Sequence, residues 1–442
     1  MMSAVRASLR SRFQGCLVGG VIGDCVGAPF EVTGSGGSPR YVRKFAEKIP
    51  SVPPGSLQFT DDTAMARSIT ASLIQHNGEY KPMDMAKRFA SEYSKEPGRG
   101  YGGNVIDVFA ALGDDKLKDA YEPAKKQFGG SGSYGNGGAM RVAPVGLCME
   151  ERFIQMIEIA KSSAQITHSN ALGYNGAILQ ACAVHLALHA DPKTFCRCTY
   201  VDKLIGIMSS QEKKDPDDNL KGAKRARMTF MGKEMSDDEV SDDESGGPET
   251  QGVYCHKLRV LKNGMVLTRG ERDDLYGMTF MGKEMSDDEV SDEESGGPET
   301  QGVYCHKLRV LKKFLEKADN GTDVRMDDVV EHLGNRISAH YSVPTAIYCF
   351  LNAMHPMNDF PDYNAFQRTI LYAIALDGDT DTIASMAGAI AGAYYGIEAI
   401  PKPWITACEG AEDALKKADD LYSIMVNTET SKEGAATSDE EK

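Results

Sequence analysis

Two clusters of aspartate and threonine are the residues of this chain best suited to chemistry. They are Thr60-Asp61-Asp62-Thr63 and, about three hundred residues later, Asp377-Gly378-Asp379-Thr380-Asp381-Thr382. Carboxylates this dense repel one another unless a cation lies between them, and their oxygens are hard ligands that suit Mg²⁺, Mn²⁺ or Ca²⁺. If the fold brings the clusters together, we expect them to hold a pair of metal ions and to activate a water.

The elements that carry these clusters are predicted to be helices. Each cluster opens a run rich in alanine and methionine, and Thr60 or Asp61 can cap a helix that continues through Leu73. The run 383–393 consists mostly of small residues, which predicts a buried helix closely approached by its neighbours. Apolar residues recur with the helical period in four further segments, 84–93, 153–163, 175–188 and 327–333. No series of alternating strands is evident, so the sequence predicts an all-α fold.

A glycine-rich loop, residues 129–138, is the second chemical signal. Six of its ten residues are glycine. Backbone N–H groups can therefore approach a ligand, and such loops suit phosphate or diphosphate. The loop matches neither the P-loop pattern nor the dinucleotide-binding pattern. Tyr134 and Phe128 are placed to stack on a base or a ribose, although a surface loop without function would have the same composition.

The composition argues against some classes of protein. Of the 442 residues, 41% are hydrophobic, which suffices for a substantial core, and the net charge of −15 disfavours nonspecific binding to nucleic acid or anionic membranes. We expect no apolar run to span a bilayer, because the nearest candidate, 16–30, is short and interrupted by Asp24. Three arginines before the first acidic residue resemble a mitochondrial presequence, but a frayed N-terminus is the simpler explanation.

An acidic insert interrupts the helical pattern. Residues 228–262 recur as 278–312 with one difference, Asp243 against Glu293. A repeat constrained by packing would have diverged further, so a recent duplication or a gene-model error explains it better. Residues 228–312 carry 10 basic and 19 acidic side chains, which favours a disordered insertion, and an acidic tail follows at 428–442. We expect one helical domain of residues 1–227 and 313–427, with the native connection in the second copy.

Several motifs occur in order outside the insert. The first are Gly23-Asp24-Cys25-Val26-Gly27 with Glu31, and the cluster at Thr60 continued by Ala64-Met65. Then come the loop 132–141, Thr167-His168 with the segment 173–177, and the segment 342–346 with the second aspartate cluster. Together they resemble the ADP-ribosylglycohydrolase family, in detail its vertebrate ADP-ribosylserine hydrolases. The resemblance covers residues 10–227 and 313–425 and leaves the insert outside.

The resemblance implies an all-α fold that binds two Mg²⁺ ions, or Mn²⁺ in their place. The implied metal ligands are Glu31, Thr60, Asp61, Asp62, Asp379, Asp381 and Thr382. Glu31 would be a mobile carboxylate that joins the metal site or moves away to admit substrate, a role that spacing alone would not assign to it. The implied ADP-ribose pocket consists of Phe128, Ser131, Gly132, Ser133, Tyr134, Gly135, Asn136, Gly137, His168 and Ile337. A buried, purely structural imidazole is the alternative for His168.

The implied reaction is hydrolysis of the α-O-glycosidic bond at the anomeric carbon of ADP-ribose, with Asp61, Asp62 or Glu31 handling the proton. The implied substrates are serine-ADP-ribosylated proteins, poly(ADP-ribose) and O-acetyl-ADP-ribose. The implied setting is the DNA-damage response in the nucleus and cytoplasm, with the mitochondrial matrix as a further compartment. We expect a monomer that binds neither DNA nor membrane. The alternatives are an ADP-ribosylarginine hydrolase, which cleaves an N-glycosidic bond, and a noncatalytic ADP-ribose binder or structural relative.

Two features depart from the family's pattern. The family usually has two glycines before the last aspartate pair, whereas this chain has Asp377-Gly378. Asp377 adds a charge and a Cβ beside the predicted metal site, and aspartate would tolerate a positive φ there only moderately well. The insert replaces a segment expected near the substrate pocket, so both features bear on activity.

Overall fold

The structure of the protein is a computed structural model that describes residues 7–33, 38–213 and 302–439. The described residues are predominantly helical and contain no strand, only two isolated bridges, which confirms the predicted all-α fold. The insert expected at 228–312 lies outside the described residues except for its last part, 302–312.

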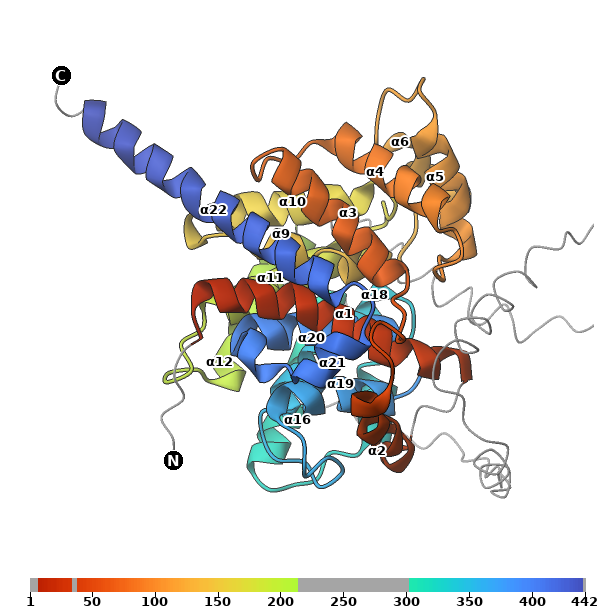
Figure 1. Ribbon diagram of the computed structural model, residues 1–442, viewed down its shortest axis with the longest axis vertical. Coiled ribbons are helices and arrows are strands. Elements are labelled where there is room, and N and C mark those ends of the chain that lie inside the picture. Colours follow the sequence, from red (N-terminus) through yellow and green to blue (C-terminus); the bar gives the residue numbers. More distant parts are fainter. Residues whose placement is uncertain (1–6, 34–37, 214–301, 440–442) are drawn as a thin grey trace, which may run out of the picture.

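Two helices, α1 (Leu9–Thr33) and α20 (Thr380–Tyr395), pack against each other at the centre of the fold (Figure 1). Glycines at 15, 19, 23 and 27 lie on the face of α1 that meets α20, and a Cβ on Gly15 would lie 2.4 Å from the carbonyl oxygen of Gly392. Only glycine permits backbones to approach this closely. Gly27 meets Asp381 at the opposite end of the contact, so the helices are antiparallel. The C-terminal end of α1 therefore lies beside the start of α20.

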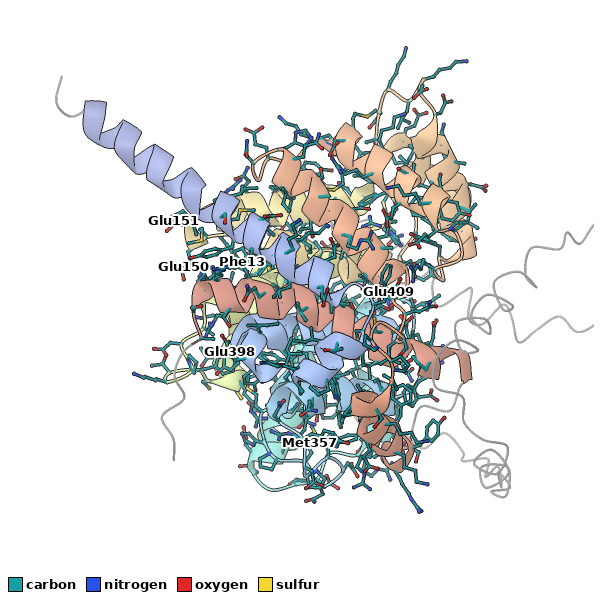
Figure 2. The ribbon with its side chains drawn as sticks, in the orientation of Figure 1. Phe13, Glu150, Glu151, Met357, Glu398 and Glu409 are labelled. Carbon is teal, nitrogen blue, oxygen red and sulfur yellow. The ribbon has the colours of Figure 1, made fainter. Side chains whose placement is uncertain are left out.

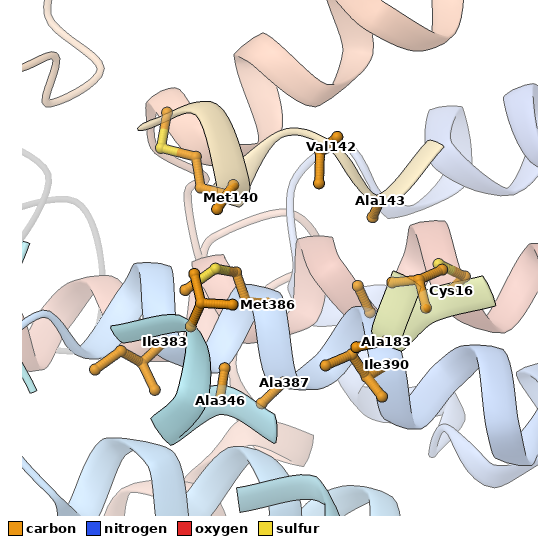
Figure 3. Close-up of a cluster of buried hydrophobic side chains, with 14 of the residues drawn as sticks. Cys16, Met140, Val142, Ala143, Ala183, Ala346, Ile383, Met386, Ala387 and Ile390 are labelled. Atoms are coloured by element: carbon orange, nitrogen blue, oxygen red, sulfur yellow. The ribbon is translucent and has the colours of Figure 1, made fainter. Parts of the chain in front are cut away.

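Three apolar helices enclose α20: α11 (Ala171–His189), α18 (Ala339–Asn352) and α19 (Ala365–Ala375). Figure 3 shows Ile383, Met386 and Ile390 of α20 close to Ala183 of α11 and Ala346 of α18, all buried. The predicted buried helix over 383–393 is thus confirmed, and its small residues explain why four helices fit around it.

The helices predicted from the sequence are present. Those predicted at 84–93, 153–163, 175–188 and 327–333 are α4, α10, α11 and α17, and the one predicted from Thr60 or Asp61 is α3.

Further helices surround this centre. Their bounds, in chain order, are α2 (Pro39–Lys48), α3 (Asp61–Gln75), α4 (Pro82–Lys95), α5 (Ile106–Gly113), α6 (Glu122–Lys125), α7 (Gln127–Gly130), α8 (Gly137–Met140), α9 (Ala143–Gly146), α10 (Phe153–Gln165), α12 (Arg197–Glu212), α17 (Met326–His332) and α21 (Lys402–Ala407).

The last helix, α22 (Ala411–Asp439), crosses α1 (Figure 1). The Arg10 guanidinium donates to the Asp419 carboxylate at 2.8 and 2.9 Å, and the rings of Phe13 and Tyr422 meet edge to face. Figure 2 marks Phe13 on α1 at this crossing. The contact holds the N-terminal half of α1 and so contributes to fixing its other end at the site.

The end of the second repeat copy belongs to the helical domain. Helix α16 (Val303–Asp319) begins inside that copy, and Tyr304, Leu308 and Leu311 are fully buried. The Glu212 carboxylate at the end of α12 accepts hydrogen bonds from the backbone N–H groups of Tyr304 (2.8 Å) and Cys305 (3.1 Å). Residues 303–312, which we expected within the insert, are therefore part of the domain, because their apolar side chains complete the packing against α12 and α18.

Within the described residues, two helices are long and apolar enough to cross a membrane by length and composition, namely Leu9–Glu31 and Ala171–His189. Both apolar runs are longer than expected from the sequence. Their most apolar windows are 83% and 94% buried inside the fold, as those of core helices are.

Candidate active site

The start of α3 is tied to α1 by a buried aspartate, Asp24. Its carboxylate accepts hydrogen bonds from the backbone N–H of Thr60 (3.0 Å), the Thr60 hydroxyl (2.8 Å) and the backbone N–H of Thr63 (3.0 Å). Burial raises the pKa of Asp24 to about 6, while these hydrogen bonds act in the opposite direction. Asp24 lies in one of the motifs named above but was not predicted to belong to the site. The feature that could have identified it is a single aspartate within an apolar run.

The two aspartate clusters meet at Asp62. One carboxylate oxygen, Oδ2, accepts a hydrogen bond from the Thr382 hydroxyl (3.1 Å) and lies 3.3 Å from the Thr60 hydroxyl, whose proton points to the nearer Asp24. The other oxygen, Oδ1, is buried and has no hydrogen-bond partner within the described chain. Burial raises the pKa of Asp62 well above its usual value, and the negative charges of Asp24, Asp61 and Asp379 raise it further. A buried oxygen among like charges is the environment that a cation would complete.

A second group of acidic side chains comes from α1 and α20. Carboxylate oxygens of Glu31, Asp379 and Asp381 all lie within 4.8 Å of one another. Asp379 accepts a hydrogen bond of 2.5 Å from the Asn136 side chain, and Asp381 accepts one of 2.8 Å from the backbone of Thr382. The donor set consists of hard oxygens, which fits a divalent cation of the Mg²⁺ or Mn²⁺ type.

The turn before α20 takes an unusual backbone conformation. Asp377 and Gly378 both have positive φ, 62° and 77°. A Cβ on Gly378 would lie 2.1 Å from the carbonyl oxygen of Asn335, which accepts the backbone N–H of Asp379 at 2.9 Å. The position at which the family usually has its first glycine therefore has a positive φ. Asp377 adopts this backbone conformation, and the hydrogen bond from Asp379 to Asn335 still forms.

The glycine-rich loop packs against the segment before α18. The backbone N–H of Asn136 donates to the carbonyl of Ile337 (2.8 Å), and that of Ala339 donates to the carbonyl of Tyr134 (3.1 Å). Glycine is required at Gly137, where a Cβ would lie 2.6 Å from the ring of His168. These contacts hold the bare backbone of the loop opposite His168.

A cavity of about 410 Å³ lies between this loop and the acidic groups. Among the predicted site residues, those that line it are Glu31, Asp61, Asp379, Asp381, Thr382, Phe128, Ser133, Tyr134, Gly135, Asn136, Gly137, His168 and Ile337. Phe128 and Ile337 are 49% and 68% exposed, which is unusual for large apolar side chains in this fold. The lining of the cavity therefore contains an acidic group that includes Glu31, Asp379 and Asp381. It also contains two solvent-exposed apolar side chains, Phe128 and Ile337, called here the apolar pair.

Four predicted residues do not line this cavity. Thr60 and Asp62 lie behind the acidic surface, where Asp62 is buried. The Ser131 hydroxyl turns back to the carbonyl of Phe128 (2.9 Å), and Gly132, with φ of 70°, packs against Ser169.

The cavity also includes residues that the sequence analysis left out of the site. The segment 100–105 forms part of the lining, with Met65, Phe109 and Arg141. The only feature of the sequence that could have placed this segment in the site is its glycines, which resemble those of the glycine-rich loop. Arg99, just before it, donates to the carbonyl of Phe59 (3.1 Å) and pairs with Glu409, which Figure 2 labels near the start of α22. The Arg99 carbonyl accepts the backbone N–H of Asp61 (2.8 Å), so this arginine braces the start of α3.

Comparison with known proteins identifies the family of this chain. The family model described as ADP-ribosylglycohydrolase matches residues 5–251 and 279–430. The protein named ADP-ribosylhydrolase ARH3 is 39% identical in Homo sapiens over 423 residues, covering 94% of this chain and 94% of that protein. Its namesake in Mus musculus is 38% identical over 424 residues, covering 94% and 92%. In Danio rerio the identity is 37% over 427 residues, covering 95% and 93%. This chain belongs to the ADP-ribosylglycohydrolase family.

Proposed function

We propose that this protein is a metal-dependent ADP-ribosylhydrolase that removes ADP-ribose from serine side chains of modified proteins. One observation carries the proposal: a single cavity joins an acidic group (Glu31, Asp379 and Asp381) to a glycine-rich loop and an exposed apolar pair. ADP-ribose has three parts that these surfaces suit: the adenine, the diphosphate and the ribose at which the bond is cleaved. Similarity to the vertebrate proteins named ADP-ribosylhydrolase ARH3 supports the hydrolase part of this proposal.

The loop is suited to bind the diphosphate. Backbone N–H groups of glycines can approach phosphate oxygens without interference from side chains. The apolar pair, Phe128 and Ile337, is suited to enclose the adenine, because flat rings bind well between large apolar side chains. With the adenine and the diphosphate so placed, the remaining ribose extends toward the acidic residues.

The donor set fits two Mg²⁺ ions, with Mn²⁺ as a substitute. Glu31, Asp379 and Asp381 would hold them with Asp61, Asp62 and the hydroxyls of Thr60 and Thr382, and the buried Oδ1 of Asp62 supports this assignment. When bound, the ions supply positive charge that polarises the substrate's oxygens and favours a nucleophilic water.

The proton transfers are assigned to Glu31 or Asp61. Hydrolysis breaks the bond between the anomeric carbon and the serine oxygen, and a water oxygen bonds to that carbon. The water loses a proton to a carboxylate, and the departing serine oxygen gains one. Asp62 is less suited to this role because its carboxylate is buried and accepts the Thr382 hydroxyl, whereas Glu31 and Asp61 line the cavity.

The wider biology follows from the same proposal. We propose poly(ADP-ribose) and O-acetyl-ADP-ribose as further substrates, because both carry an O-linked ADP-ribose. We also propose that the protein acts as a monomer in the DNA-damage response, in the nucleus and cytoplasm and in the mitochondrial matrix, without binding DNA or membranes.

The test is release of ADP-ribose from a serine-ADP-ribosylated peptide, with Mg²⁺ and with EDTA, beside an arginine-linked peptide. We expect release from the serine peptide only with Mg²⁺, and a loss of about a hundredfold or more in Glu31→Gln or Asp61→Asn. Glu151→Gln, at an exposed position outside the cavity, is the matched control. Preference for the arginine peptide would replace the serine assignment, and ADP-ribose binding without release from either peptide would favour a noncatalytic binder.

A further inference from the structure

A buried arginine, Arg141, lies near His168 in the lining of the cavity. The Arg141 guanidinium is 1% exposed and donates from Nη2 to the carbonyl oxygen of Ser163 (3.0 Å) and to the Thr167 hydroxyl (2.7 Å). It also stacks on Phe89 at 4.3 Å from the ring centroid. Arginine has no acceptor atom, so the Thr167 oxygen must accept this hydrogen bond.

The direction of the next hydrogen bond follows from that constraint. Thr167 Oγ1 lies 2.7 Å from Nδ1 of His168, and a hydroxyl has only one proton to donate. If Thr167 donates to Nδ1, both the Thr167 hydroxyl and Nδ1 of His168 are satisfied. If Nδ1 donated instead, Thr167 would accept twice, and its own buried proton would need a further acceptor. The first arrangement leaves the single ring proton of a neutral His168 on Nε2.

The Nε2 edge of His168 faces the glycine-rich loop. A Cβ on Gly137 would lie 2.9 Å from Nε2, and a Cβ on Gly135 would lie 3.4 Å from it. Both loop residues and His168 line the same cavity. Burial and the charge of Arg141 together lower the pKa of His168 to about 3, so the ring stays neutral at physiological pH.

We propose that Arg141 and Thr167 are positioning residues that fix His168 in the Nε2-protonated tautomer, so that it donates a hydrogen bond to a phosphate oxygen of the ligand. Arg141 thereby favours diphosphate binding through the Thr167 hydroxyl. In this arrangement His168 is a donor to substrate and takes no proton from it. The inference rests on the proposed function only for the identity of the ligand, since the tautomer belongs to the free protein.

The first measurement needs no ligand. Nitrogen-15 NMR of the histidine-labelled protein at pH 7, with the His168 signal assigned from His168→Gln, reports which ring nitrogen carries the proton. We expect the Nε2-protonated tautomer alone. A ring protonated on Nδ1, on both nitrogens, or exchanging between the two tautomers would overturn the proposal.

The second measurement links the tautomer to binding. Thr167→Val removes the hydroxyl with little change in shape, and we expect mixed tautomers of His168 and about tenfold weaker ADP-ribose binding by calorimetry. Thr167→Ser should restore both properties. Thr369→Val is the matched control, because Thr369 is also fully buried and donates to a helix carbonyl (2.9 Å) far along the chain. It should change neither property.

The outcomes separate this inference from the proposed function. If the wild-type protein does not bind ADP-ribose, the proposed function fails, while the NMR result still decides the tautomer. If Thr167→Val retains one tautomer and full affinity, the positioning role is wrong even though the hydrolase assignment stands. Should the valine variant not fold, the wild-type tautomer and the serine variant still provide the decision.

Discussion

At the scale of single residues, the site concentrates negative charge that the rest of the protein must tolerate. Asp24 and Asp62 are buried, and both have raised pKa values because burial disfavours their charged forms. Asp24 is compensated by three hydrogen bonds from the start of α3, whereas Asp62 retains one buried oxygen without a partner in the described structure. In the proposed metal site, affinity for the ions would therefore be obtained at the expense of the stability of the metal-free protein.

Replacing Asp62 with asparagine separates these two effects. We expect Asp62→Asn to weaken Mg²⁺ binding about a hundredfold, because an anionic ligand is lost, as calorimetry would measure. The same change should raise the free energy of unfolding of the metal-free protein by about 1 kcal/mol, because repulsion with the neighbouring aspartates disappears. Urea denaturation in EDTA measures this, with Glu151→Gln as the surface control. Weaker binding together with lower metal-free stability would contradict the account.

Two substitutions separate the effect of the backbone conformation of Asp377 from the effect of its charge. Its φ of 62° is more readily adopted by glycine, so Asp377→Gly should raise the free energy of unfolding by about 0.5 kcal/mol. Asp377→Asn keeps the backbone cost and removes only the charge, so it should weaken Mg²⁺ binding severalfold without changing stability. Equal Mg²⁺ affinity in the wild type and the asparagine variant would show that the charge lies too far from the ions to matter.

At the scale of elements, the site depends on the close approach of α1 and α20. Helix α1 supplies Asp24 and Glu31, and α20 begins at the second aspartate cluster. Neither helix could bring its carboxylates to the other if side chains separated the backbones. The glycines of α1 therefore contribute to the proposed metal site although they supply no ligand to it.

Gly23→Ala tests this dependence. A Cβ there would lie 2.1 Å from the carbonyl oxygen of Ala384, so the helices must separate, and we expect a loss of about 3 kcal/mol in stability with weaker Mg²⁺ binding. Gly206→Ala in α12 is the matched control, because a Cβ there meets nothing within 4 Å. It should stabilise the protein by about 0.5–1 kcal/mol, as alanine does in an open helix position. Urea denaturation and calorimetry measure both variants, and a tolerated Gly23→Ala would refute the packing argument.

At the scale of the whole molecule, buried histidines make stability depend on pH. Burial and the nearby Lys307 lower the pKa of His340 to about 4. Between this value and the unfolded pKa of about 6.5, the unfolded chain binds a proton that the folded protein does not, so stability falls as the pH falls. His168 and His185, with pKa values lowered to about 3 and 4, act in the same direction.

The variant His340→Gln isolates one of these contributions. Between pH 7 and pH 5, the wild type should lose about 2 kcal/mol more stability than His340→Gln, as urea denaturation at both pH values would measure. Thr345→Val, a buried change on the same helix that removes a hydrogen bond to the carbonyl of Gly334, should shift stability equally at both pH values. An identical pH dependence in the wild type and the glutamine variant would contradict the assignment.

The duplicated insert allows a second test of the whole molecule. Deleting residues 228–277 removes the first copy and its spacer but keeps α16 and every residue of the cavity. Because the carboxylate of Glu212 contacts the start of α16, the two described ends of this connection, 213 and 302, lie close together, and the residues that remain between them are enough to join them. We expect unchanged melting temperature and unchanged ADP-ribose release. A large fall in either quantity would give the first copy a structural or functional role.

The sequence by itself determined the helical class and the residue types that are available for chemistry. The helical period, the start of a helix at Thr60-Asp61, the small residues of 383–393 and the dense aspartates are local patterns, and local patterns do not depend on the tertiary arrangement. The Thr60 side chain was expected to cap the helix, but it makes no capping hydrogen bond and donates to Asp24 instead. Contacts between distant residues were different. That α1 and α20 are antiparallel, that Asp24 rather than a surface residue holds the start of α3, and that Arg141 supports His168 depend on which backbones meet. Only the tertiary structure decided them, because buried hydrogen bonds and helix contacts join residues that no spacing in the sequence relates.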